Sequence, residues 1–173
     1  DPGQTRLMEA TGSLVRPPHR GPHQLETGRR PIGGTSMVNF TQAAQQAQQW
    51  VNELAVDLNW DERRAYHLLR CVLHALRDWL SQEEMADLSA QLPVIIRGLY
   101  FEGWKPLDTP VWERKKADFI DRVQGAFSDD LLNDPDAAVA AVFRLLNRHI
   151  SHGEIVQVRN SMKMSLRELW PAD

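Results

Sequence analysis

Cysteine and long apolar runs are nearly absent from this sequence. Cys71 is the only cysteine among 173 residues, which excludes the framework of internal disulfides typical of small secreted domains and fits a reducing compartment. No stretch approaches the roughly 18 consecutive apolar residues that a membrane span requires, and the first residues contain no signal-peptide core. We therefore expect a cytoplasmic protein with no membrane as partner.

A large excess of one charge is absent as well. The formal net charge is −3 at pH 7, which gives no reason to expect a nucleic acid or an anionic membrane as partner. The sequence also lacks a glycine-rich phosphate loop, a G-x-S-x-G nucleophile elbow and an H-E-x-x-H zinc helix. Cys71 lies inside a predicted helix without an evident activating base, so we do not expect a thiol nucleophile. These absences favour a protein that is not an enzyme and binds no cofactor.

No stretch alternates apolar and polar residues with the period of a strand, and this absence predicts an all-α fold. What the sequence does contain is an internal repeat, because residues 68–100 match residues 138–170 without a gap. The identical pairs are Val72 and Val142, Leu76 and Leu146, Ser81 and Ser151, Glu84 and Glu154, Arg97 and Arg167, and Leu99 and Leu169. Self-similarity at a fixed period indicates a duplicated structural unit. We predict two tandem repeats of three or four helices, residues 37–105 and 106–173, packed into one helical bundle.

Capping residues and apolar spacing predict the individual helices. We expect helices at residues 41–56, 59–80, 81–93, 94–101 and 110–127, then helices that begin at Asp134 and Ser151, and a short last helix that ends near Trp170. Pro93 ends or kinks the third helix because proline lacks an N–H group. An apolar stripe runs along the second helix through Leu69, Val72, Leu73, Leu76 and Leu80. Residues 102–110 form a connector between the two repeats.

Proline, glycine and arginine are concentrated in residues 1–36, which hold five of the ten prolines and six of the ten glycines. This segment has too few apolar residues to offset the entropy of ordering it, so alone we expect it to be irregular. One interpretation is a leader, with Met37 as the natural start. The other is a tether that docks on an acidic partner surface through Arg16, Arg20, Arg29 and Arg30.

Nucleic-acid binding through these arginines is a further alternative, and it predicts a strongly salt-dependent affinity. The tail's five arginines and three acidic residues give it a charge of +2. Since the whole chain carries −3, the remaining residues carry −5. A broad nucleic-acid footprint on the helical body is therefore not expected.

A polar ladder of His67, Cys71, His74 and Asp78 follows the side of the second helix that lies opposite the stripe. Imidazole and thiolate groups one turn apart can share a zinc ion. The ligand set is incomplete, however, and the second repeat does not reproduce it, so we predict no metal and keep His67, Cys71 and His74 only as candidate ligands. Because cysteine prefers burial, Cys71 indicates that another helix or a partner covers this face.

Two further groups of residues are predicted to be structural. His149, His152 and Glu154 have the spacing H-x-x-H-x-E, but Glu154 already belongs to a capping pair with Ser151. Arg97 and Arg167 recur at equivalent positions of the two repeats, together with the capping glutamates. We expect structural ion pairs here rather than anion-binding sites.

Aromatic residues crowd the connector: Tyr100, Phe101, Trp104 and Trp112. Aromatic side chains near a glycine bend are enriched in interfaces, because they offer a large rigid contact area. They also pin packed repeats together. We favour this junction role and keep all four residues as candidates for binding a partner.

Several phrases also carry a family resemblance. They are LHALR at residues 73–77, QLP at 91–93, IRGLYFEGW at 96–104, RHISHGE at 148–154 and LRELWP at 166–171. In these phrases the sequence resembles a bacterial family known only as domain of unknown function 2267, over about residues 40–171. The resemblance implies a helical bacterial domain without an established activity or catalytic residues. Lys105 departs from it, because the family pattern implies an acidic residue there.

We therefore expect a non-enzymatic interaction or adaptor module that presents helix faces to another protein, with the basic tail as a docking segment. The alternative is a small-ligand or metal-binding protein, or an enzyme, that uses a pocket between the repeats. The sequence leaves a homo-oligomer open. It does not identify the partner.

Overall fold

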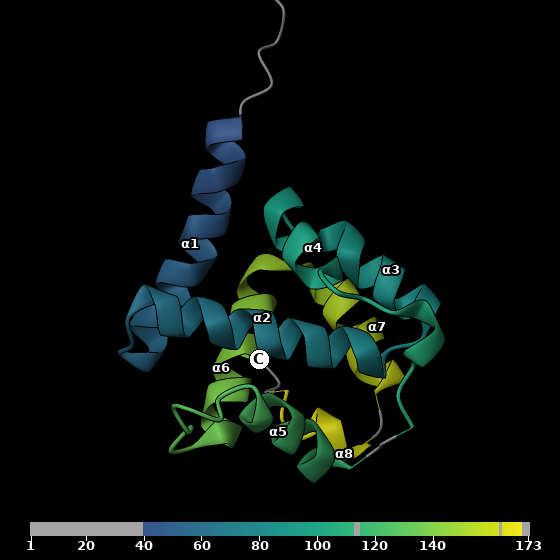
Figure 1. Cartoon of the computed structure of the whole chain (residues 1–173). Helices are drawn as coiled ribbons and strands as arrows, with labels where there is room; N and C mark the ends of the chain where they lie inside the picture. The colour runs from purple at the N-terminus through teal and green to yellow at the C-terminus, as the bar shows by residue number, and fades with distance from the viewer. Residues whose placement is uncertain (1–39, 113–114, 163, 171–173) are drawn as a thin grey trace, which may run out of the picture. The chain divides into compact units, whose positions relative to one another are not determined.

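The computed structural model describes residues 40–112, 115–162 and 164–170. The chain divides into two units, residues 1–37 and 38–173, and every described residue belongs to the second unit. The predicted tail at residues 1–36 therefore lies outside the described residues. All regular elements in the described ranges are helices, with no strand among them (Figure 1). The predicted all-α fold is confirmed.

The helices follow one another along the described residues, with the longest connection between α4 and α5. They are α1 (Phe40–Leu58), α2 (Glu62–Trp79), α3 (Gln82–Gln91), α4 (Val94–Phe101), the 3-10 turn η1 (Pro106–Asp108), α5 (Lys116–Gly125), α6 (Pro135–His149), α7 (His152–Ser161) and α8 (Met164–Arg167). None of them combines the length and the apolar character that a membrane crossing requires.

Side-chain caps begin several helices where the sequence predicted them. The Ser81 hydroxyl accepts a hydrogen bond from the Glu84 N–H at 3.2 Å, and the Glu84 carboxylate accepts one from the Ser81 N–H at 3.0 Å. This reciprocal pair satisfies two backbone donors that the helix itself leaves free. Asp134 caps α6 and Ser151 caps α7 through one bond each, in which the side-chain oxygen accepts from a backbone N–H.

Two predicted helix starts near the N-terminal side are wrong by a few residues. α1 already includes Phe40, so Thr41 lies inside the helix rather than at its cap. α2 is capped by Asp61, whose carboxylate accepts from the Arg64 N–H at 3.0 Å. Asn59 instead adopts a positive φ of 53°, a left-handed conformation that asparagine tolerates better than most residues. It lies in the turn between α1 and α2.

α5 also begins later than predicted, at Lys116 rather than at Pro110. The Val111 N–H donates to the backbone carbonyl of Asp78 at 2.8 Å, which holds this part of the chain against the end of α2. Because α5 begins at Lys116, the connector between the two halves extends from residue 102 to residue 115.

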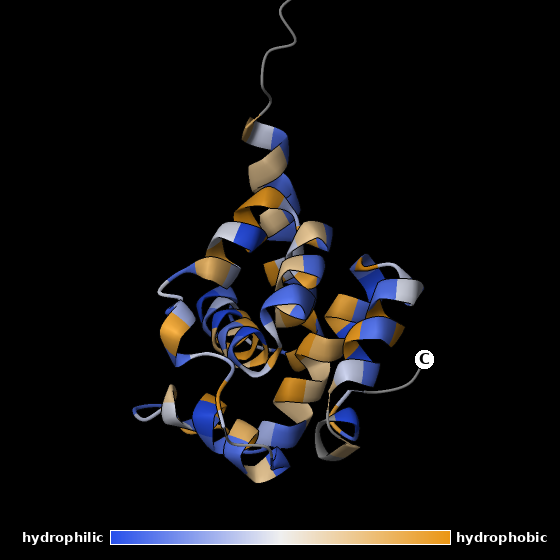
Figure 2. Cartoon of the chain, turned by 90° about the vertical axis from the view of Figure 1, so that its right-hand side faces the viewer, coloured by the Kyte–Doolittle hydropathy of each residue, from blue (hydrophilic) through white to orange (hydrophobic). Residues whose placement is uncertain are grey.

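α2 lies at the centre of the described unit and contacts α1, α4, α5 and α6 (Figure 1). Its predicted stripe is buried at every position: Leu69, Val72, Leu73, Leu76 and Leu80. These side chains belong to a single apolar core that includes residues from both halves of the chain. In Figure 2 orange and blue segments alternate along the helices, as expected where each helix buries one face and exposes the other.

Several helix contacts of the two halves correspond to one another. α1 packs on α6 and on α4, while the matching helix α5 packs on α2 and on α8; α2 packs on α6, and α3 packs on α7. Two repeats related by an approximate two-fold axis would form helix contacts of this kind. The internal repeat itself stays a prediction, to which these contacts lend support.

Arg97 and Arg167 have the same role in their two halves. The Arg97 guanidinium donates to the carbonyls of Ser89 at 2.8 Å and Leu92 at 3.1 Å, and that of Arg167 donates to the Met162 carbonyl at 2.9 Å. These carbonyls lie at the ends of α3 and α7, where a helix leaves acceptors unsatisfied. The two arginines thus cap helix C-termini, instead of forming the ion pairs that the sequence predicted.

Candidate functional site

A pocket of about 440 Å³ lies where α2, the connector and the end of α5 meet. We call it the junction pocket. Its lining comes from α2 (Arg70, Cys71, His74, Ala75, Arg77, Asp78), from the connector (Gly103, Lys105, Asp108, Thr109) and from the end of α5 (Arg122, Ala126). Its volume falls in the range of ~300–1,000 Å³ that is usual for small-molecule sites. The chain thus encloses a polar space between residues that are distant in sequence.

The polar ladder predicted on α2 lies along this pocket. Cys71, His74 and Asp78 line it, whereas His67 lies one turn earlier and outside the lining. The prediction that another helix covers the Cys71 face is confirmed, because α5 packs on α2. Cys71 is half-buried there, and this burial raises the pKa of its thiol, with Arg70 partly offsetting the effect. A raised pKa leaves less thiolate at neutral pH, so the thiol is not activated.

The two histidines of the ladder bond to different elements. The ring Nε2 of His67 lies 2.8 Å from the Ala126 carbonyl at the end of α5, and that of His74 lies 2.7 Å from the Leu99 carbonyl of α4. Because a carbonyl only accepts, each ring donates through Nε2. The Cys71 sulfur lies 4.0 Å from His67 Nδ1. Among the described residues no three His, Cys, Asp or Glu side chains are placed to hold a metal ion.

A buried ion network that the sequence did not predict forms the inner part of the pocket. Arg77 Nε donates to Asp78 Oδ1 at 2.7 Å, and Arg77 Nη1 donates to the carbonyls of Tyr100 and Glu102 at 2.8 and 2.9 Å. Arg122 Nη2 donates to Asp78 Oδ2 at 2.5 Å. The side chains of Arg77 and Asp78 are only 5% and 8% exposed. The network ties the end of α4, the connector and α5 to α2.

The charged groups at the outer edge are more exposed. Arg70 Nε donates to Glu102 Oε2 at 2.8 Å; this hydrogen bond, with the positive charge of Arg70, lowers the pKa of the Glu102 carboxyl. Burial lowers the pKa of His74, and the neighbouring charges of Arg77 and Arg70 lower it further. His74 is therefore neutral at pH 7, in agreement with its role as a donor through one ring nitrogen only.

This lowered pKa makes the stability of the protein depend on pH. Below about pH 6.5, the usual pKa of histidine, the unfolded chain binds a proton at His74 that the folded chain does not, so stability falls as the pH falls. We expect the His74→Gln variant to lose less stability than the wild type between about pH 6.5 and pH 5. The difference should stay below ~1 kcal/mol, because His74 is half-buried and solvent screens its charge.

Urea unfolding at both pH values measures this difference. The wild type, unfolded in the same buffers, is the reference for the slope. Equal slopes for the wild type and the His74→Gln variant would show that another group titrates in this range.

The aromatic residues around the connector take different positions. Tyr100 is fully buried, and its hydroxyl donates to the Met85 carbonyl at 3.3 Å. Phe101 and Trp104 are half-buried, with ring centroids 5.8 Å apart in an edge-to-face arrangement. Trp104 Nε1 donates to Thr109 Oγ1 at 3.0 Å. These three side chains hold the connector against the helices, and the burial of Tyr100 excludes it from any contact with a partner.

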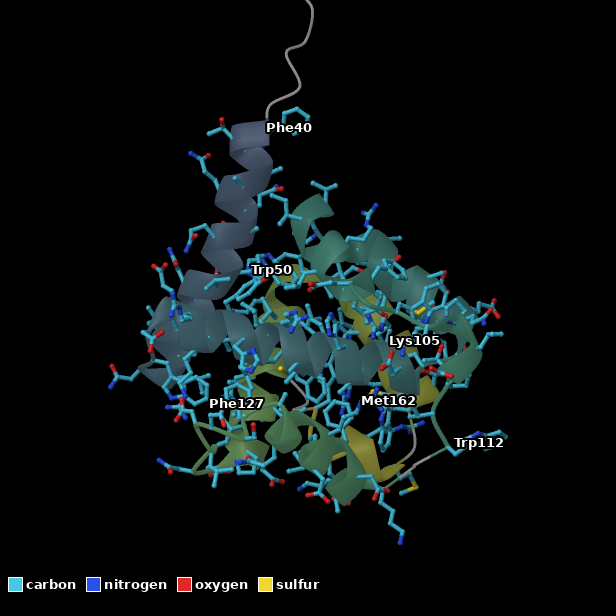
Figure 3. The ribbon with its side chains drawn as sticks, in the orientation of Figure 1. Phe40, Trp50, Lys105, Trp112, Phe127 and Met162 are labelled. Carbon is cyan, nitrogen blue, oxygen red and sulfur yellow. The ribbon has the colours of Figure 1, made fainter. Side chains whose placement is uncertain are left out.

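Trp112 is the exception among these residues. It is 94% exposed, and Leu107 in the same connector is 100% exposed. Figure 3 shows Trp112 extending outward from the connector, whereas the buried Trp50 lies among the helices. Of the four aromatic candidates for partner binding, Trp112 therefore offers the largest free surface. The four arginine candidates, Arg16, Arg20, Arg29 and Arg30, lie outside the described residues.

The second histidine cluster has a structural place in the fold. The His149 ring stacks on Trp50 with 4.8 Å between centroids, and its Nε2 lies 2.8 Å from Glu53 Oε2. Ser151 accepts from the Glu154 N–H at 3.4 Å, as a helix cap. His149 thus turns toward α1, while Glu154 stays at the start of α7. These contacts account for the H-x-x-H-x-E spacing without a metal.

Comparison with known families places the chain among its relatives. A family model described as "Uncharacterized conserved protein (DUF2267)" matches residues 47–169. A search of curated proteins found no match. The matched range covers most of α1 and continues through α2, the connector and α5, so it includes the whole lining of the junction pocket. Since it spans well over half of the sequence, the chain belongs to the DUF2267 family of uncharacterised conserved proteins.

Proposed function

We propose that this protein is a non-enzymatic interaction module, and that the connector carries its docking surface for another protein. The observation that carries the proposal is the 94% exposure of Trp112 beside the fully exposed Leu107. A tryptophan buries ~150–250 Å² when it is covered, and tryptophan is enriched among the residues that dominate binding energy. The fold gains little packing from either side chain.

The surroundings of Trp112 support the same conclusion. The connector is fixed to α2 by the hydrogen bond from Val111 to Asp78 at 2.8 Å and by the bonds of Arg77 to the Tyr100 and Glu102 carbonyls. A surface held in place before binding loses less entropy when a partner covers it. We infer a partner with an apolar pocket or groove that accepts the indole ring.

Three finer assignments belong to the same proposal. The matched helix contacts favour an origin by duplication. The single cysteine favours a cytoplasmic location, and the family resemblance favours a bacterial source. The basic tail is a second docking element.

Capture of partners from a native lysate tests the proposal. We expect the full chain to retain a specific protein, and the Trp112→Ser variant to lose most of it, by about tenfold or more, because truncating such a residue commonly costs ~2 kcal/mol or more of binding energy. A chain that lacks residues 1–36 shows separately what the tail contributes.

A matched control is Leu131→Ser, since Leu131 is also an exposed apolar residue, at 65%, but lies in the segment between α5 and α6. This variant should retain the partner. Equal retention by the wild type and the Trp112→Ser variant would contradict the assignment of the docking surface, and recovery of no protein by any form would count against an interaction module.

A further inference from the structure

The junction pocket contains more cationic than anionic side chains. Its lining includes four cations, Arg70, Arg77, Lys105 and Arg122, and two acids, Asp78 and Asp108. Arg70 is satisfied at the rim by its 2.8 Å bond to Glu102. The positive charges of Arg77, Lys105 and Arg122 remain to be balanced by negative groups.

Asp78 cannot compensate both arginines that bind it. Its Oδ1 accepts from Arg77 and its Oδ2 accepts from Arg122, so one negative charge faces two positive ones. The Arg77 and Asp78 side chains are almost excluded from water, at 5% and 8% exposure. The cluster therefore carries one more positive charge than negative charge, and Arg122, whose side chain is 43% exposed, presents the excess charge at the pocket.

Bonds among the described residues leave some donors on these groups unused. The bonds described for Arg77 use Nε and Nη1, and the bond described for Arg122 uses one Nη2–H. In the part of the chain that the structure describes, the Lys105 ammonium has no carboxylate within ion-pairing distance. Donors thus reach the pocket from α2, from the connector and from α5.

We propose that the junction pocket is a binding site for a phosphate group, either as inorganic phosphate or as the phosphomonoester of a small molecule. A tetrahedral phosphate accepts hydrogen bonds from several directions, whereas a planar carboxylate is satisfied by one guanidinium fork. Arginine and lysine are the usual cationic partners of phosphate. The site uses neither Trp112 nor Leu107, so it does not depend on the proposed docking function.

Calorimetric titration of the full chain with sodium phosphate at low ionic strength tests the site. We expect saturable binding with a dissociation constant on the order of 1 mM or lower, and binding about tenfold weaker in the Lys105→Gln and Arg122→Gln variants. The Lys105 variant guards against a folding defect, because the Lys105 side chain makes no ion pair with the described residues. Arg144→Gln is the matched control, since Arg144 is exposed on α6, and it should bind as the wild type does.

Cys71 locates the bound anion, because it lines the same pocket and is the only cysteine of the chain. We expect phosphate to slow alkylation of Cys71 by iodoacetamide at about pH 8.5, and to have no such effect in the Lys105→Gln variant. The Trp112→Ser variant should bind phosphate normally, which separates a failure of this site from a failure of the docking surface.

Comparison of phosphate with glycerol 3-phosphate and acetate shows which anion the pocket binds. Tighter binding of glycerol 3-phosphate than of phosphate would support a phosphomonoester, and equal binding would support free phosphate. Binding of acetate as tight as that of phosphate would overturn the assignment to phosphate. The site itself is refuted by an absence of binding, by equal weakening in the Arg144 control, or by unchanged alkylation of Cys71.

Discussion

Replacing Arg77 with methionine is expected to lower the free energy of unfolding by about 3 kcal/mol, the lower end of the range of ~3–5 kcal/mol for breaking a buried ion pair. Methionine replaces the aliphatic part of the arginine side chain but is shorter, carries no charge and donates no hydrogen bond. Two backbone carbonyls, those of Tyr100 and Glu102, then lose their donor. The value lies at the lower end because Arg122 still faces Asp78. Urea unfolding followed by far-UV circular dichroism measures the loss.

The matched control is Arg70→Met on the same helix. Arg70 also binds an acid, Glu102, but its side chain is 36% exposed and that of Glu102 is 52% exposed. Exposed pairs contribute little, because both groups remain solvated. The midpoint of unfolding should therefore hardly change. If both variants lost the same stability, the network around Asp78 would have no special role in the fold.

Replacing Trp170 with alanine should cost about 3–5 kcal/mol, as is usual for truncating a large buried aromatic residue. Trp170 is 1% exposed. Its ring stacks on Phe143 with centroids 4.5 Å apart and planes 4° apart, and its Nε1 donates to Asn147 Oδ1 at 2.6 Å. The cavity left behind and the lost hydrogen bond act in the same direction.

Trp112→Ala provides the contrast, since it removes the same side chain from a position that is 94% exposed. Surface substitutions of this kind usually change stability by less than ~0.5 kcal/mol. A large loss in this variant would show that the indole of Trp112 packs against the protein, and it would remove the main support for the docking surface.

Local signals explain which parts of the fold could be predicted from the sequence. The stripe on α2 and the capping pair of Ser81 and Glu84 depend on residues a few positions apart, and both are found as predicted. The late start of α5 could not be predicted in this way. The segment before α5 is held to the end of α2 by the bond between Val111 and Asp78, which joins residues that only the tertiary fold brings together.

The candidate site, too, could be predicted only where it depends on residues that are close in sequence. The preference of Cys71 for burial correctly indicated that another element covers the ladder. Nothing local connects Asp78 with Arg122, however, because they are 44 positions apart. Lys105 stood out only as a departure from the family pattern. A pocket between the repeats could thus be named as an alternative from the sequence, but its cationic lining could not.

The two halves of residues 38–173 should unfold as one cooperative unit around α2. Urea unfolding of the Trp170→Ala variant tests this most directly, because all remaining tryptophans lie at or before position 112 and their fluorescence reports on the first half and the connector. We predict that fluorescence and circular dichroism follow one common transition at a lower urea concentration than in the wild type. A fluorescence transition that stays at the wild-type midpoint, while circular dichroism shows a separate earlier step, would contradict the account.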